Sequence, residues 1–186
     1  AAIDASSLRL PPNLSFAAYD AELAGSPWAW DDYAAGEKID HVDGTTIEES
    51  EHMMATRLYQ NTARVHFNQF VEGQGRFGRR LIYGGHIISI ARALSFNGLG
   101  NAALVVGING GRHVNPCFAG NTVFAWSEIA AKAELPGRSD CAALRVRTVA
   151  TKDQPCTEFP DKDAKGAYPE SVILDLDYWV AMPKRH

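Results

Sequence analysis

The most constraining feature of this sequence is an apolar helical pattern that begins at a pair of glycines. Four apolar residues recur at the spacing i, i+3, i+4 and i+7 of one helix face: Ile87, Ile90, Ala91 and Leu94. Ile88 and Ala93 carry the apolar surface further round the same helix. We therefore expect a long helix over residues 84–95 that its neighbours cover on most sides.

Short strand patterns dominate the rest of the chain. Alternating apolar and polar residues predict strands near residue 40 and over four later stretches: 102–107, 122–134, 141–151 and 172–182. Gly110-Gly111 reads as a turn, and residues 152–170 read as a polar loop. An antiparallel sheet wrapped around one helix satisfies both patterns, so the expected fold class is α+β.

The part of the chain before the buried helix predicts an extension followed by a shorter helix. Residues 1–32 are interpreted as an N-terminal extension or linker, and residues 33–183 as the domain proper. Thr45 or Thr46 is the expected N-cap of a helix that begins near Ile47. Met54 and Leu58 then complete a buried stripe with Ile47.

Composition excludes several classes of function. The chain has 186 residues and a net charge of -4, which argues against a nucleic-acid-binding surface. No apolar run approaches the roughly 18 to 20 residues of a membrane span, so we expect no membrane partner. The three cysteines are widely spaced and lack a C-x-x-C pair, which predicts buried thiols in a reducing cytoplasm and no metal site.

Two motifs carry the candidate chemistry. Asn61 and His66 stand five residues apart at the end of the first predicted helix, and Gly84-Gly85 opens the second. The glycines leave backbone N–H groups unshielded at a helix start, which suits an anion or a developing oxyanion. A third stretch places Arg112 and His113 before Pro116.

These motifs together resemble those of the MaoC-like, or hydratase-2, acyl-CoA hydratases, which have the hotdog fold. The resemblance covers residues 33–182 and implies an antiparallel sheet around a central helix, an acyl-CoA thioester substrate and no cofactor beyond CoA as its carrier. It implies that His66 transfers the proton and that the Gly84 N–H stabilises the thioester oxygen, with the Gly85 N–H as a possible second donor. Asn61 stands where the family has an acid, and an amide orients water but does not act as a base.

Further residues near these motifs are secondary candidates. His86 and His113 are expected to be near the site, because strand ends and helix starts converge in such a fold. Arg76, Arg79 and Arg80 precede the buried helix, where they would contact CoA phosphates or a substrate carboxylate, or else belong to a solvated loop. Arg92 is the other candidate for the carboxylate.

Within this family the sequence most resembles the C-terminal half of the mesaconyl-CoA (2-methylfumaryl-CoA) hydratases, which consist of two hotdog domains in tandem. This implies hydration of mesaconyl-CoA to β-methylmalyl-CoA and the reverse dehydration, in the cytoplasm. It also implies a second hotdog domain, in a homo-oligomer or in a second half. Two alternatives stay open, namely a non-catalytic substrate-binding half and a thioesterase with Glu72 as its base.

Overall fold

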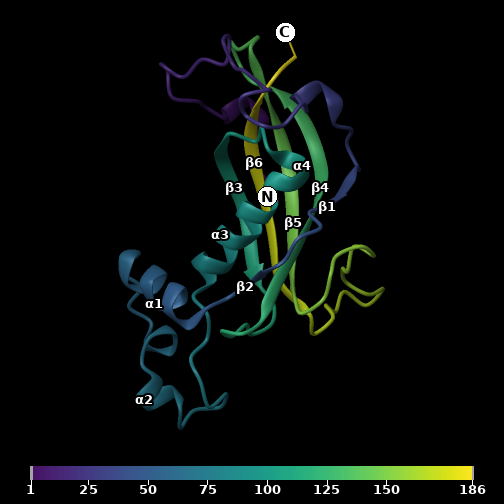
Figure 1. The fold of residues 1–186 in the computed structure, drawn as a ribbon. Coiled ribbons are helices and arrows are strands. Elements are labelled where there is room, and N and C mark those ends of the chain that lie inside the picture. Colours follow the sequence, from purple (N-terminus) through teal and green to yellow (C-terminus); the bar gives the residue numbers. More distant parts are fainter. Residues whose placement is uncertain (1, 186) are drawn as a thin grey trace.

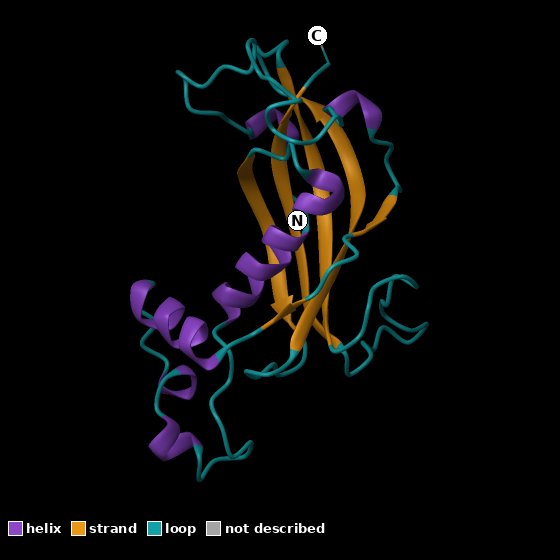
Figure 2. Cartoon of the chain, viewed as in Figure 1, coloured by secondary structure: helices purple, strands orange, loops and turns teal. Residues whose placement is uncertain are grey.

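A single antiparallel sheet curves around the helix α3 (Gly84–Leu94) in the computed structural model, which describes residues 2–185 (Figures 1 and 2). The strand order is β1-β4-β5-β6-β3, and β2 also pairs with β4. The strands are β1 (Lys38–Asp40), β2 (Thr45–Thr46), β3 (Leu104–His113), β4 (Thr122–Glu134), β5 (Cys141–Lys152) and β6 (Val172–Pro183). The other helices are α1 (Glu49–Leu58), α2 (Gln69–Glu72) and α4 (Phe96–Leu99).

The inner face of the sheet and α3 form the main core. All four residues of the predicted helix face are buried, as expected from their spacing: Ile87, Ile90, Ala91 and Leu94. Alternate residues of β5 and β6, such as Leu144, Val146 and Leu174, belong to the same core because successive strand residues point to opposite faces. Ala93 is exposed, so the sheet covers α3 on one side and the expected cover on most sides is absent.

The N-terminal segment, residues 2–32, covers part of the outer face of the sheet. Leu8 and Phe16 are buried there against Cys141, Ala143 and Trp179. The indole Nε1 of Trp30 donates a 3.0 Å hydrogen bond to the Ala143 carbonyl. This segment is therefore a packed layer, not a free linker.

Two expectations about the region before α3 were wrong. Thr45 and Thr46 form β2 and pair with Val123 and Thr122 of β4, so their backbone is extended and does not cap a helix. The helix α1 begins at Glu49, and no side chain caps it. Met54 and Leu58 are 58% and 70% exposed, because α1 turns a different face, with His52, Ala55 and Thr56, towards the protein.

The predicted turn at Gly110-Gly111 was also wrong. β3 continues through both glycines to His113, and they pair with Asp177 and Leu176 of β6. β3 has two register shifts, one of them just before Gly110, and the sheet accommodates the glycines there as an irregular strand. The strand therefore delivers His113 to the end of α3 where the helix starts.

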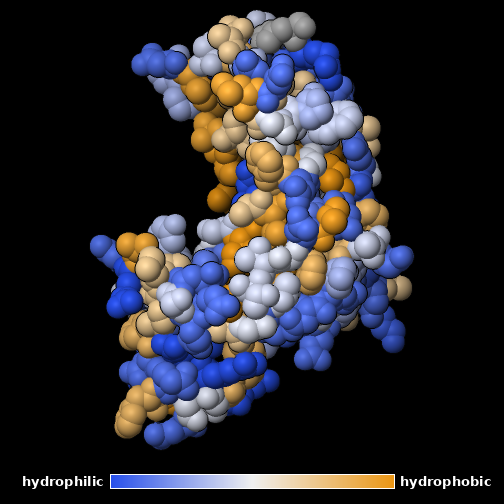
Figure 3. All heavy atoms as spheres, viewed as in Figure 1, coloured by the Kyte–Doolittle hydropathy of each residue, from blue (hydrophilic) through white to orange (hydrophobic). Residues whose placement is uncertain are grey.

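A lobe made of α1, α2 and the loop that follows them extends away from the sheet (Figure 1). Figure 3 shows a hollow between this lobe and the upper part of the molecule, on the side of β3, with apolar residues at its inner wall. Val105 and Ile108 on the edge strand β3 are 40% and 62% exposed. The β3 side of the molecule is thus both hollowed and partly apolar.

A chain of hydrogen bonds crosses the buried side of the sheet through five side chains: His41, Ser127, Thr148, Tyr178 and Arg92. The three links from His41 Nε2 to the Tyr178 hydroxyl are each 2.8 Å, and Arg92 Nη1 lies 3.3 Å from that hydroxyl. Arg92 only donates, and the Asn97 carbonyl 2.6 Å from His41 Nδ1 only accepts. The chain is therefore directional and requires neutral His41 with its proton on Nδ1.

We expect the protein to lose stability as pH falls below about 6.5. Burial lowers the pKa of His41, and loss of hydration also lowers the pKa of His52 and His113. As the pH falls, the unfolded chain therefore binds these protons before the folded chain does. The contribution of the neutral histidines to the free energy of unfolding is complete above the unfolded pKa of about 6.5. Below it, the free energy of unfolding falls by at most about 1.4 kcal/mol per pH unit for each histidine.

Urea unfolding at intervals between pH 7.5 and pH 5 measures this loss. The shifted aspartates, such as Asp140 and Asp175, have lowered pKa values and lose their contribution only below their ordinary value of 3.8, outside this range. A free energy of unfolding that stays constant or increases as the pH is lowered from 7 to 5 would contradict the expectation.

Candidate active site

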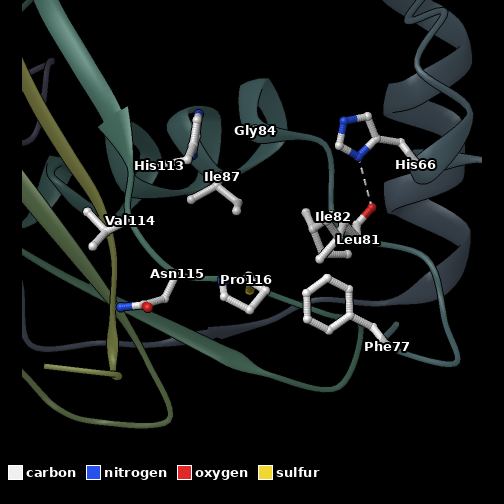
Figure 4. Close-up of a pocket in the computed structure, with 11 residues that line it drawn as sticks. His66, Phe77, Leu81, Ile82, Gly84, Ile87, His113, Val114, Asn115 and Pro116 are labelled. Carbon is white, nitrogen blue, oxygen red and sulfur yellow. Dashed lines mark hydrogen bonds between the residues drawn. The ribbon is translucent and has the colours of Figure 1, made fainter. Parts of the chain in front are cut away.

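A cavity of about 360 Å³ lies where the N-terminal end of α3, the end of β3 and the loop before α3 meet (Figure 4). Its walls are mostly apolar and include Phe77, Leu81, Ile82, Ile87 and Pro116. Two imidazoles, those of His66 and His113, and the first residue of α3, Gly84, also line it. The cavity therefore combines an apolar chamber with a few polar groups, as ligand sites do.

His66 presents one ring nitrogen to this cavity. It ends a short 3-10 helix (Arg64–His66), and its Nδ1 lies 3.1 Å from the Leu81 carbonyl (Figure 4). Because a carbonyl only accepts, Nδ1 carries the proton in the neutral ring and Nε2 keeps its lone pair. The ring also packs edge-on against Tyr83, with 5.8 Å between centroids. His66 is thus held as a base with Nε2 available.

The start of α3 supplies hydrogen-bond donors beside the imidazoles. No side chain caps the helix at Tyr83, whose carbonyl accepts from the N–H groups of His86 and Ile87. The N–H groups of Gly84 and Gly85 precede the first helical acceptor and have no partner within the helix. Gly84 lines the cavity, whereas Gly85 lies against the Tyr83 ring. A Cβ on Gly85 would fall 2.5 Å from this ring.

His113 lies directly against Gly84. A Cβ on Gly84 would fall 2.4 Å from His113 Nε2, so only glycine leaves room for the ring in this position. Loss of hydration, together with repulsion from His66, lowers the pKa of His113. His113 is therefore a neutral imidazole at pH 7 beside the first residue of α3.

Asn61 is not among the residues that line the cavity. Its Oδ1 accepts a 2.8 Å hydrogen bond from the Ala63 N–H, which closes a local turn just after α1. Such turns are a common use of asparagine outside helices. The structure brings His66 and Gly84 together, but it holds the Asn61 amide in the backbone turn that leads to His66.

The other predicted residues divide into two groups. His86 and Arg80 tie the lobe together, since His86 Nε2 lies 3.0 Å from Glu51 and Arg80 pairs with Glu49. Arg92 belongs to the buried chain at the other end of α3 and also donates to the Ala102 carbonyl. None of these three lines the cavity.

Arg76 and Arg79 lie against two aromatic rings that contact each other, and one of these rings, Phe77, lines the cavity. The Arg79 guanidinium is 4.0 Å from the centroid of the Phe118 ring, and that of Arg76 is 5.0 Å from the ring of Phe77. Within residues 2–185 neither arginine has a carboxylate partner. Both are therefore available for an anion outside the protein.

Of the remaining candidate groups, Cys117 lines the cavity as a buried thiol, and the others lie elsewhere. Glu72 is on α2 and does not line the cavity. All three cysteines are buried, and burial raises the pKa of each thiol to about 11, as expected for core residues. The described part of the chain holds no group of three or more metal-binding side chains and no helix that is long and apolar enough to cross a membrane.

No family model matches the chain, but individual proteins do. It is 66% identical over 178 residues to the β-methylmalyl-CoA dehydratase of Chloroflexus aurantiacus. The aligned stretch covers 96% of this chain and 51% of that protein. It is 57% identical to the mesaconyl-CoA hydratase of Cereibacter sphaeroides, over 98% of this chain and 52% of that protein. The crystal structure of a MaoC domain dehydratase from Chloroflexus aurantiacus superposes with a TM-score of 0.93 at 64% identity, over 98% of this chain and 52% of the other.

The chain has the hotdog fold. A Mycobacterium tuberculosis protein with a double hotdog fold agrees in fold alone, with a TM-score of 0.65 at 16% identity. The hotdog domain spans about half the length of the curated relatives it matches.

Two features of the hotdog domain's site had no signal, or only a weak one, in the sequence. The Leu81 carbonyl fixes the tautomer of His66, and a backbone acceptor leaves no trace in residue identities. The contact of His113 with Gly84 depends on β3 continuing past two glycines that predict a turn. The convergence of strand ends and helix starts was the one signal for His113.

Proposed function

We propose that this hotdog domain belongs to an acyl-CoA hydratase/dehydratase that interconverts mesaconyl-CoA and β-methylmalyl-CoA. The observation that carries the proposal is His66, with its Nε2 free at an apolar cavity that also meets the start of α3. The names of the two curated relatives, a dehydratase and a hydratase of this pair of thioesters, support the same reaction.

The geometry supports a single-base mechanism. The His66 Nε2 removes a proton from water, whose oxygen bonds to the β-carbon, and the electrons of the double bond move towards the thioester oxygen. The Gly84 N–H stabilises that oxygen as negative charge develops on it. The imidazolium of His66 then returns the proton to the α-carbon, and dehydration follows the reverse course. These steps use no metal or redox cofactor, and CoA serves only as the carrier.

We assign Arg76 and Arg79 to the anionic part of the substrate. Both guanidiniums lie against the contacting rings of Phe77 and Phe118, the first of which lines the cavity, without a carboxylate partner in the described chain. CoA phosphates beside the cavity, or the free carboxylate of the acyl group, would form ion pairs with these guanidiniums.

Replacing Arg79 by leucine is expected to raise KM for the CoA thioester by up to about five-fold, with little change in kcat, because an exposed ion pair contributes up to about 1 kcal/mol. Steady-state kinetics with mesaconyl-CoA measures this. The same comparison with a pantetheine thioester, which lacks the nucleotide, distinguishes the two anions. The effect disappears if Arg79 binds a CoA phosphate and persists if it binds the acyl carboxylate; an unchanged KM for both substrates contradicts the assignment.

We also propose a second hotdog domain as partner, in a homo-oligomer or in a longer chain. β3 is an edge strand with unpaired backbone groups, and it carries the exposed side chains of Val105 and Ile108. Figure 3 shows a hollow with an apolar inner wall on this side of the molecule. The mass of the purified chain in solution tests whether copies associate. A location in the cytoplasm remains a prediction from the cysteines.

One observation favours a second candidate function, a non-catalytic half that binds the acyl chain. Asn61 replaces the acid of the family motif, and its amide oxygen is used in a local turn. The thioesterase alternative has no such support, since Glu72 lies on α2 away from the cavity.

The test of the proposed function is the enoyl-thioester absorbance of mesaconyl-CoA mixed with the purified protein, with a thiol reagent in a parallel sample. Loss of absorbance without thiol release is expected for a hydratase. Thiol release would identify a thioesterase. A folded protein that binds mesaconyl-CoA and leaves its absorbance unchanged would be a non-catalytic half.

A further inference from the structure

The cavity contains more chemistry than the single-base mechanism uses. His113 lines it together with His66, and Figure 4 shows the two side chains near the start of α3. Within the described residues no side chain or backbone group hydrogen-bonds to the ring nitrogens of His113. An imidazole that faces an apolar cavity without a protein partner is available to a ligand.

The position of His113 is set by the fold. Its backbone pairs with Leu174 of β6 as the last residue of β3, and the next residue, Val114, donates to the Ile173 carbonyl. Its side chain therefore leaves the strand on the cavity side, whereas Arg112 lies on the outer face, beside Arg147 and Asp175. Gly84 then allows the ring to approach the first turn of α3, where a Cβ would fall 2.4 Å from Nε2.

We propose that His113 is a second hydrogen-bond donor to the thioester oxygen, acting through its Nε2–H beside the Gly84 N–H. This inference rests on the proposed function and names a catalytic residue for it. We place the donor at Nε2 because this atom lies 2.4 Å from where a Cβ on Gly84 would fall, and the N–H of Gly84 is the proposed oxyanion donor. Its lowered pKa keeps the ring neutral, and a neutral imidazole still has one N–H to donate.

The geometry also divides the work between the two histidines. His66 has Nδ1 committed to the Leu81 carbonyl, so it offers only a lone pair to the cavity until it takes a proton. His113 has no such commitment and can place its proton on Nε2. One ring thus accepts the proton from water while the other stabilises the enolate oxygen, and no proton has to leave His113 during the reaction.

The test compares two replacements of His113 that differ in their ability to donate. Leucine removes the donor, whereas the side-chain amide of glutamine places an N–H at a similar reach. We expect His113→Leu to lower kcat for mesaconyl-CoA hydration by about 10²- to 10³-fold with little change in KM, as loss of one oxyanion donor does. His113→Gln should keep at least ten-fold more activity than His113→Leu. Arg112→Leu is the matched control on the same strand and should resemble the wild type.

A binding measurement separates this inference from the proposed function. The absorption of 4-dimethylaminocinnamoyl-CoA moves to longer wavelength when donors polarise its thioester carbonyl, and this needs no turnover. The wild type, His113→Gln and Arg112→Leu should shift the bound probe, and His113→Leu should shift it less.

An equal shift with His113→Leu bound, equal activities of the two His113 variants, or a wild type that binds no probe or leaves its spectrum unchanged would overturn the inference. If the wild type shifts the probe through His113 but does not hydrate mesaconyl-CoA, the proposed function fails and the donor role of His113 stands. Circular dichroism of each variant verifies that the exposed strand end has kept its fold.

Discussion

Replacement of His66 by glutamine is expected to lower kcat for mesaconyl-CoA hydration by about 10²- to 10⁴-fold, the usual contribution of a general base. Glutamine keeps a polar side chain that can still bond to the Leu81 carbonyl, but it has no lone pair basic enough to take a proton from water. KM should change little, because the apolar walls of the cavity, such as Phe77 and Ile87, remain. The rate of change of the enoyl-thioester absorbance at saturating mesaconyl-CoA measures the loss in kcat.

Asn61→Ala serves as the comparison for His66→Gln. Its amide oxygen bonds to the Ala63 N–H, so we expect the loss of activity to be at least ten-fold smaller than that of His66→Gln. A loss of equal size would show that Asn61 leaves its turn and takes part in the reaction. Full activity of His66→Gln would remove His66 from the mechanism and leave His113 as the only imidazole that lines the cavity among residues 2–185.

Thr148→Val is expected to destabilise the protein by about 1–3 kcal/mol, the cost of leaving a buried hydrogen-bonding group without a partner. Valine has nearly the shape of threonine, so packing between β5 and α3 is preserved. The hydroxyl of Tyr178, however, loses its acceptor 2.8 Å away, and the Ser127 hydroxyl loses a donor. Both residues are buried, so water cannot replace the missing contacts. Urea unfolding at pH 7.5 measures the change.

The double variant Thr148→Val with Tyr178→Phe separates this cause from a packing effect. Removing both partners leaves no unsatisfied Tyr178 hydroxyl, and Arg92 keeps the Ser95 hydroxyl and the Ala102 carbonyl. The double variant should therefore lose less stability than the sum of the two single variants. Strictly additive losses would mean that the hydrogen bond between Thr148 and Tyr178 contributes no coupling energy to stability.

The sequence predicts the central helix and the sheet well because their patterns are periodic. The spacing of Ile87, Ile90, Ala91 and Leu94 follows from burial on one helix face, and apolar and polar residues alternate in the middle of β5 and β6. Local rules failed where tertiary pairing decided the backbone. Thr45 and Thr46 are good helix caps, but β4 offers them a strand partner instead.

The site was predicted in part for the same reasons. The 17 residues between His66 and Gly84 contain no regular pattern, so a family resemblance and not periodicity places the two together. The structure then adds what sequence spacing does not contain: the carbonyl that orients His66 and the contact between His113 and Gly84. Long side chains such as Arg80 have several partners within reach, and only the packing of the lobe selects Glu49.

The N-terminal layer on the outer face of the sheet sets an order for folding. Phe16 contacts Asp140 across 124 positions, and the Ile3 N–H bonds to Asn109 across 106. The surface that receives this layer consists of residues from β3, β4, β5 and β6, which leave the ribosome long after it. The surface on which residues 3–16 pack is therefore complete only once β6 has been made. Contacts this distant along the chain slow folding, so residues 3–16 dock only after the strands that follow them.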